Sequence, residues 1–266
     1  FRFNEDISSY EIGADYSRTL GDGTWKIIGL RRYEDREGDI YFENTLTDDV
    51  LYAFKSISKP TETETVIRTI YSFKPQEGHS VDIALEGAKN TLKTSSLFEE
   101  NTGNGYNVFE VDGSDIEVNE DRAEFSIQYS RPVFTGWSIQ SLLATEYSKL
   151  SVKGDNEPRS ESFNRYKGFV ALNGVLSKQS SLRTRLERSV GQLSFGDFAS
   201  SKNINEGTDN GGNTHLVPDQ TWRGEISYEH TFGATDILTI TAFTEHVEHF
   251  ITFVPFGDGT EGRDNI

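Results

Sequence analysis

The sequence contains no cysteine and no methionine among its 266 residues. The lack of cysteine excludes a disulfide framework, a thiolate metal site and a cysteine nucleophile. No window approaches the roughly 18 consecutive apolar residues that a membrane-spanning helix needs. Membrane-spanning strands are not excluded, because they pair their backbone groups with one another and need apolar side chains only at alternate positions.

Basic residues are also scarce. The 26 Lys and Arg residues face 43 Asp and Glu residues, which gives a formal charge of −17 and argues against a nucleic-acid partner. Only 34% of the residues are hydrophobic, whereas 12% are aromatic. This balance suits a barrel with one apolar face, and it suits a polar secreted β-protein equally well.

Apolar and polar residues alternate strictly in several segments, which is typical of strands with one buried or lipid-facing side. In 122–131, for example, Phe125 and Ile127 alternate with Glu124 and Ser126. In a barrel, this alternation predicts the following lipid-facing side chains: Tyr10, Ile12, Tyr16, Val81, Ile83, Leu85, Phe125, Ile127, Tyr129, Ile226 and Tyr228. The polar faces would line a wet or plugged lumen.

Short and long connections alternate along the chain. Tight turns rich in Gly, Pro, Asp and Ser are predicted at 20–23, 74–78, 131–136, 176–179 and 232–236. Long polar loops are predicted at 34–63, 90–121, 150–162, 193–220 and 251–266. Outer-membrane barrels have short periplasmic turns and long extracellular loops, whereas a β-sandwich has no reason to place every long loop at one end.

The fold class predicted from this rhythm is all-β, the wall of an antiparallel up-and-down transmembrane β-barrel. About ten strands are expected, joined in chain order with every tight turn at one end. They lie near 8–20, 24–34, 64–74, 80–90, 121–131, 136–149, 163–175, 180–192, 220–232 and 236–250.

One region carries a family resemblance. The run 188–198 ends in Gly191-Gln192-Leu-Ser-Phe195-Gly196-Asp197-Phe198, and after a polar loop Asn213, Leu216, Pro218 and Trp222 follow in order. This pattern resembles the barrel of proteobacterial TonB-dependent receptors, in which an RxxGQLxFGDF-like run is followed by a loop with an N-x-x-L-x-P-x-x-x-W pattern. The clear match covers about 60 residues, by our alignment of the run and the loop with that pattern.

The resemblance implies a barrel of about 22 strands in the outer membrane of a Gram-negative bacterium. It also implies a plug domain with a TonB box, the periplasmic energy-coupling protein TonB, surrounding lipid, and active uptake of an extracellular small molecule or chelate. The sequence shows neither a plug nor a TonB-box candidate, and Ile266 is not the terminal aromatic of a completed barrel. We therefore expect residues 1–266 to be an interior part of one barrel domain, an open arc unable to close alone.

No catalytic, metal or cofactor site is predicted. The sequence has no nucleophile elbow, P-loop or dinucleotide fingerprint. The odd spacing of His246 and His249 places them on opposite faces of a strand. The acidic segment 99–121 is interpreted as a solvated loop rather than a cation trap.

The sequence does not identify ligand-binding residues, and three functions stay open. The leading hypothesis is a receptor wall for nutrient uptake, without enzymatic activity. A passive porin or adhesin barrel would lack the plug. A soluble, secreted, glycan-binding β-sandwich would not depend on detergent.

Overall fold

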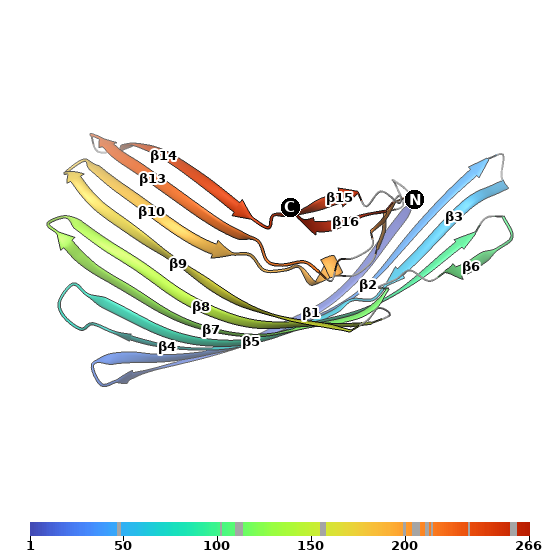
Figure 1. The fold of residues 1–266 in the computed structure, drawn as a ribbon, viewed down its shortest axis with the longest axis horizontal. Coiled ribbons are helices and arrows are strands. Elements are labelled where there is room, and N and C mark those ends of the chain that lie inside the picture. The colour runs from blue at the N-terminus through green and yellow to red at the C-terminus, as the bar shows by residue number, and fades with distance from the viewer. Residues whose placement is uncertain are drawn as a thin grey trace.

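The computed structural model shows one large curved sheet with a small second sheet on its concave side (Figure 1). No helix among the residues that the structure describes is long and apolar enough to cross a membrane. The structure describes residues 1–46, 49–101, 103–109, 114–154, 158–198, 201–203, 208–210, 213, 215–233, 235–255 and 260–266.

The large sheet has 12 strands in the described part of the chain. Those that run along the wall are β1 (Arg2–Leu20), β2 (Gly23–Leu46), β4 (Thr61–Phe73), β5 (Ser80–Asn101), β7 (Asp115–Phe134), β8 (Trp137–Gly154), β9 (Arg159–Ser177), β10 (Ser180–Val190), β13 (Gln220–Phe232) and β14 (Asp236–Glu248). The shorter β3 (Asp49–Ser58) and β6 (Tyr106–Phe109) lengthen its far end. The small sheet contains β11 (Ser201–Asn203), β12 (Thr208–Asn210), β15 (Ile251–Pro255) and β16 (Thr260–Asn265), and a short 3-10 helix, η1, spans Phe195–Phe198.

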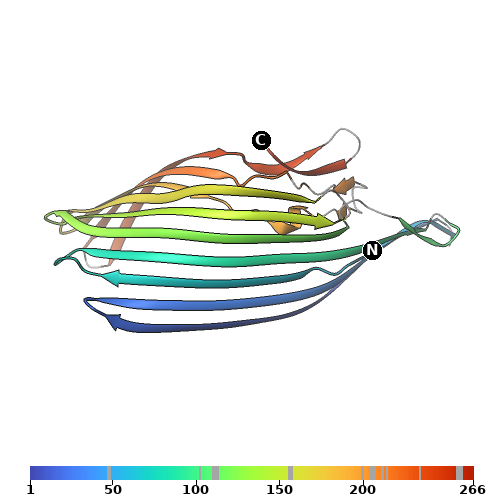
Figure 2. The same cartoon turned by 60° about the horizontal axis from the view of Figure 1, so that its bottom comes forward.

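Each long strand of the wall pairs antiparallel with the next, so the topology is up-and-down without a crossover. The five predicted tight turns lie at one end of the sheet, at the left in Figure 1 and again in Figure 2. Gly21, Gly136 and Gly233 take left-handed backbone angles in these turns, with φ of 58°, 76° and 64°. These features confirm the predicted fold class and the single-ended turns.

The predicted long loops at 34–63, 90–121, 150–162 and 251–266 are wrong, because most of their described residues are paired strand. The chain in 34–63 continues β2 and returns through β3, and 90–121 extends β5 and adds β6. Likewise, 150–162 holds the ends of β8 and β9, and 193–220 and 251–266 contain η1 and the small sheet.

The physical reason for this error is that charged residues are frequent in these segments and their apolar residues do not alternate regularly along a whole strand, as in the run Val50-Leu-Tyr-Ala-Phe54. Their paired backbones are joined by side-chain ion pairs such as Lys55–Glu99 at 3.2 Å and Lys93–Glu117 at 3.3 Å. These two pairs also show that the acidic segment 99–121 is partly neutralised by lysines on neighbouring strands. Its Glu110 and Asp112 lie outside the described residues.

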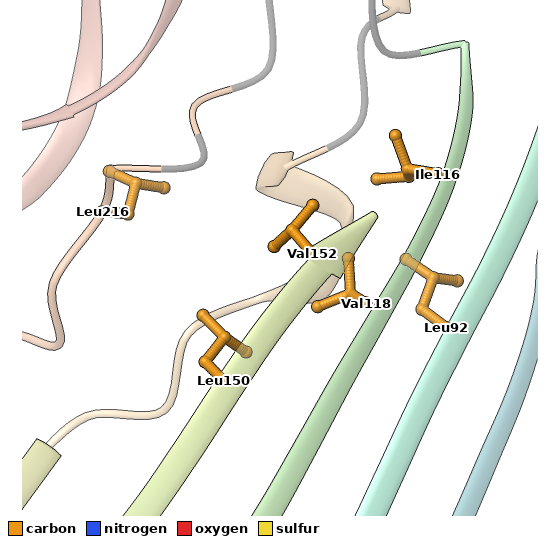
Figure 3. Close-up of a cluster of buried hydrophobic side chains, with 6 residues drawn as sticks. All are labelled: Leu92, Ile116, Val118, Leu150, Val152 and Leu216. Carbon is orange, nitrogen blue, oxygen red and sulfur yellow. The ribbon is translucent and has the colours of Figure 1, made fainter. Parts of the chain in front are cut away.

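The register sorts the side chains onto two faces. Leu92 is paired with Val118, which is paired with Val152, and all three point toward the concave side, where Leu216 meets them (Figure 3). Side chains of the opposite parity, such as Ile127, therefore lie on the convex face. The register places the whole set of apolar side chains that we expect to face lipid on this convex face. Their contact with lipid stays a prediction.

The convex face changes character along one line. It is mainly apolar next to the tight turns and becomes polar at a row of residues paired directly across five strands. This "polar row" consists of Arg31, Thr65, Lys89, Asp121 and Lys149. The line is where we expect the hydrocarbon of a bilayer to end, because charged side chains are costly within it.

This boundary can be tested with two arginine substitutions on the convex face of β8. Leu143 is 72% exposed on the turn side of the polar row, and Ser151 lies beyond the row. Leu143→Arg should lower the free energy of unfolding by about 2–4 kcal/mol, because it places a charge in hydrocarbon. Ser151→Arg should cost much less. Urea unfolding of the full-length protein in lipid vesicles measures both, and equal losses would contradict the boundary.

Candidate functional site

A set of ion pairs crosses the concave face of the wall. We call it the ion-pair ladder, and its members are Arg68, Glu86, Glu120, Arg122, Glu124, Glu146, Arg165 and Lys167. At one end, Glu86 accepts hydrogen bonds from Arg68 at 3.2 Å and from Arg122 at 3.1 Å. At the other end, Glu146 accepts them from Arg165 at 2.7 Å and from Lys167 at 2.5 Å.

The end of the ion-pair ladder that contains Glu146 is buried. Glu146 is 2% exposed, Arg165 6% and Glu120 7%. Charges this deep are tolerated only when they are paired and hydrogen-bonded, because desolvation costs several kcal/mol per ion. The four acids and four bases of the ladder balance, so this part of the wall is locally neutral although the chain carries −17. The ladder can therefore fix the strands without trapping a cation.

The segment 191–219, which we call the motif segment, has described residues that pack on the concave face beside the ladder. Leu216 is 1% exposed and packs in a cluster with Leu92, Ile116, Val118, Leu150 and Val152, as Figure 3 shows. Leu193 and Phe195 pack against the same cluster. Burial of these apolar side chains holds the segment on the wall.

Several family-motif residues have structural roles in this segment. Gly191 lies where a Cβ atom would stand 1.9 Å from Oδ1 of Asp219, and its amide donates to the Asp219 carbonyl at 2.9 Å. Pro218 is buried in the same stretch. A side chain at position 191 would therefore force the Asp219 carboxylate to move.

The motif residues Asp197 and Asn213 join distant parts of the chain. The Asn213 amide donates to the Asp197 carbonyl at 2.9 Å, and the Asn213 side chain donates to the Arg263 carbonyl at 3.0 Å. Asn265 then exchanges two hydrogen bonds with Val217, both at 2.9 Å. Strand β16 thus braces the motif segment, a contact that no pattern in the sequence predicts.

The remaining motif residues do not lie together. Gln192, Phe195 and Gly196 line a cleft on the concave side, whereas Trp222 is exposed on the convex face of β13. Phe198 belongs to η1, and its side chain lies outside the described part. The motif therefore marks one folded segment and does not converge on a reaction centre.

The cleft is the best candidate for ligand contact. It has a volume of about 280 Å³ and lies between the motif segment and the wall, with Arg32, Glu62, Glu64, Asn90 and Glu120 on the wall side. Beside it, hydrogen bonds from Arg32 and Arg36 hold the pKa of Glu34 below its usual range. Within the described residues, no group of three His, Cys, Asp or Glu is placed to hold a metal ion. The cleft instead offers charged and amide groups that can bind a polar ligand by hydrogen bonds.

No protein-family model matches the sequence, and no curated protein sequence matches it. Solved structures do match the fold. The ferric-catecholate import receptor Fiu from E. coli K12 has a TM-score of 0.65 at 10% identity, over 98% of this chain and 43% of the receptor. The hemophore receptor HasR from Serratia marcescens, solved with its hemophore and heme, has a TM-score of 0.62 at 10% identity, over 99% and 44%.

The ferric yersiniabactin uptake receptor FyuA from Yersinia pestis matches with a TM-score of 0.62 at 11% identity, over 94% of this chain and 37% of the receptor. The chain thus spans less than half the length of these receptors. They are TonB-dependent outer-membrane receptors. The chain therefore has the fold of the barrel wall of TonB-dependent receptors, in agreement with the resemblance at 188–222.

Leu216 provides a test of how the motif segment is held. Leu216→Ala removes a fully buried side chain from the cluster and should loosen the segment by about 2–5 kcal/mol. The exposed neighbour His215 supplies a matched control, and His215→Ala should have little effect. Hydrogen exchange of the amides in 191–219 measures both. Unchanged protection in Leu216→Ala would show that the cluster does not hold the segment.

Asp197 makes the same segment sensitive to pH. Burial raises the pKa of its carboxyl group above the usual 3.8, and Arg263, 3.6 Å away, only partly opposes this shift. The protonated form is thus favoured in the folded segment, so its contribution to stability is present at low pH and is lost as pH rises through the raised pKa.

Asp197→Asn should remove that pH dependence, because an amide stays neutral. Protection of 191–219, corrected for intrinsic exchange, should fall in the wild type as the pH rises above the usual carboxyl pKa of 3.8 and should stay flatter in the variant. A variant whose protection falls as steeply as that of the wild type would assign the pH dependence to other groups.

Proposed function

We propose that residues 1–266 are part of one outer-membrane β-barrel domain in a TonB-dependent receptor of a Gram-negative bacterium. The observation that carries this proposal is the division of one up-and-down sheet into two unlike faces. Its convex face is apolar beside the tight turns, and its concave face holds the ion-pair ladder and the folded motif segment. A barrel wall between lipid and a polar lumen needs this division.

The unpaired edges of the sheet support the proposal that the barrel wall contains further strands. Among the described strands, β1 pairs only with β2 and β14 only with β13. Unpaired backbone groups in lipid cost several kcal/mol each, so further strands would be needed to remove these edges. We propose a complete barrel of about 22 strands that surrounds a plug domain with its TonB box. Surrounding lipid and periplasmic TonB are its further proposed partners.

The proposed activity is energised uptake of a nutrient or chelate, without enzymatic chemistry. The matched structures include import receptors for ferric chelates and the copper transporter OprC, which supports transport as the class of function. We place the ligand contact of this chain at the cleft between Arg32 on the wall and Phe195 on the motif segment. The single large sheet of the described residues does not fit the glycan-binding β-sandwich alternative.

Uptake by cells tests the proposal. The full-length protein is expressed in a Gram-negative host without its own receptors, and uptake of a ferric catecholate, heme and copper is measured with and without TonB. We expect uptake of one of these metal compounds above the empty-vector level, and its loss without TonB. Equal uptake with and without TonB would indicate the passive porin instead.

A charge substitution in the cleft sharpens this test. If the transported chelate is anionic, Arg32→Gln should weaken its binding at least about tenfold, since a hydrogen bond to a charged group contributes about 1.5–3 kcal/mol. Lys178→Gln makes the same charge change in a tight turn and should leave binding unchanged. Equal binding by both variants would remove the cleft from the ligand path.

A further inference from the structure

The convex face has a hollow at the edge of its apolar region. The last apolar row before the polar row includes Ile67, Gly87, Ala123 and Tyr147, which are paired in this order across four strands. Ile67 is 59% exposed and Tyr147 48%, and the two small residues between them leave a groove of about 520 Å³. A Cβ atom at Gly87 would meet nothing within 4 Å. The backbone does not require glycine here, so its effect is to leave space.

Unpaired cations stand directly beyond this groove. Lys89 and Asp121 form part of its lining, and Lys149 follows Tyr147 by two residues on the same face of β8. In the described part of the chain, neither lysine has an ion-pair partner, and both are exposed. Their Cα atoms are about 10 Å apart, because one strand lies between them.

The charge of the polar row contrasts with that of the chain. Arg31, Lys89 and Lys149 against the single Asp121 give the row a net charge of +2, whereas the whole sequence carries −17. Tyr147 joins the two regions, since its ring lies in the apolar row and its hydroxyl lies 3.2 Å from Oγ of Ser162. Tyrosine with an apolar ring and a polar tip is typical of a membrane interface.

We propose that the groove and the polar row together bind a membrane lipid that carries a phosphate group. One acyl chain lies over Gly87 and Ala123, between Ile67 and Tyr147, and the phosphate lies between Lys89 and Lys149. This inference rests on the proposed function, because the convex face must meet a bilayer. A lipid is the occupant that fits, since it has both an apolar chain for the groove and an anion for the lysines. Free phosphate would satisfy only the lysines.

Native mass spectrometry of the full-length protein in detergent micelles tests the site. Phosphatidic acid is compared with phosphatidylcholine of the same acyl chains, and inorganic phosphate is added as a competitor. The wild type should retain phosphatidic acid preferentially, and inorganic phosphate should not displace it. Lys89→Gln and Lys149→Gln should each lower this retention about fivefold, since one basic side chain near an anionic lipid contributes about 1 kcal/mol.

The groove and the charge have separate controls. Gly87→Leu places a side chain in the hollow, where its Cβ atom meets nothing within 4 Å, and should lower retention of both lipids. Lys153→Gln removes the same charge on the same face of β8, beyond the polar row, and should have no effect. Unchanged retention in Gly87→Leu, or displacement of phosphatidic acid by inorganic phosphate, would overturn the lipid site.

Vesicle insertion separates this inference from the proposed function. Each variant is also mixed with phosphatidylcholine vesicles, and insertion is measured by flotation. A wild-type protein that inserts but shows no preference for phosphatidic acid overturns the lipid site alone. A wild-type protein that fails to insert in any vesicle overturns the barrel function as well.

Discussion

The structure depends on one continuous antiparallel register from β1 to β14. Because side chains in a strand alternate between faces, the parity of one strand sets the parity of its neighbour. The pairing of Ile127 with Leu143 keeps both on the convex face, and the pairing of Glu146 with Arg165 keeps both on the concave face. A slip of one residue would exchange the faces of a whole strand, which would place charges in the apolar region and break the ladder.

The ion-pair ladder favours this register over registers in which a strand is shifted. Glu146 is nearly inaccessible, and it has favourable partners only when Arg165 of the next strand lies opposite it and Lys167 lies diagonally across from it. A shifted strand would leave a buried carboxylate unpaired, and such a loss typically costs about 3–5 kcal/mol. The charges of the concave face therefore select the register, and the aliphatic side chains of the convex face can stay interchangeable.

The sequence predicts the parts of this structure in which neighbouring residues carry the signal. Strict alternation places the strand at 122–131 and assigns its faces correctly, and glycine-rich turns locate the hairpins. It does not predict the strand extensions at 34–63, because apolar and polar residues there do not alternate regularly. The charges of the ladder are visible in the sequence, but their pairing depends on register. The bracing of Asn213 by Arg263 joins residues 50 positions apart, and no local pattern records it.

The boundary on the convex face shows why single strands are insufficient. In β5 the change from apolar to polar falls between Gly87 and Lys89, and in β7, which runs the opposite way, between Ala123 and Asp121. Each change looks like an ordinary end to an alternating segment. Only the register aligns these ends, because Gly87 is paired with Ala123 and Lys89 with Asp121. The alignment brings separate polar positions into one line of charge beside a hollow. The combination of a charged line and an apolar groove is therefore a property of the paired strands and not of any single strand.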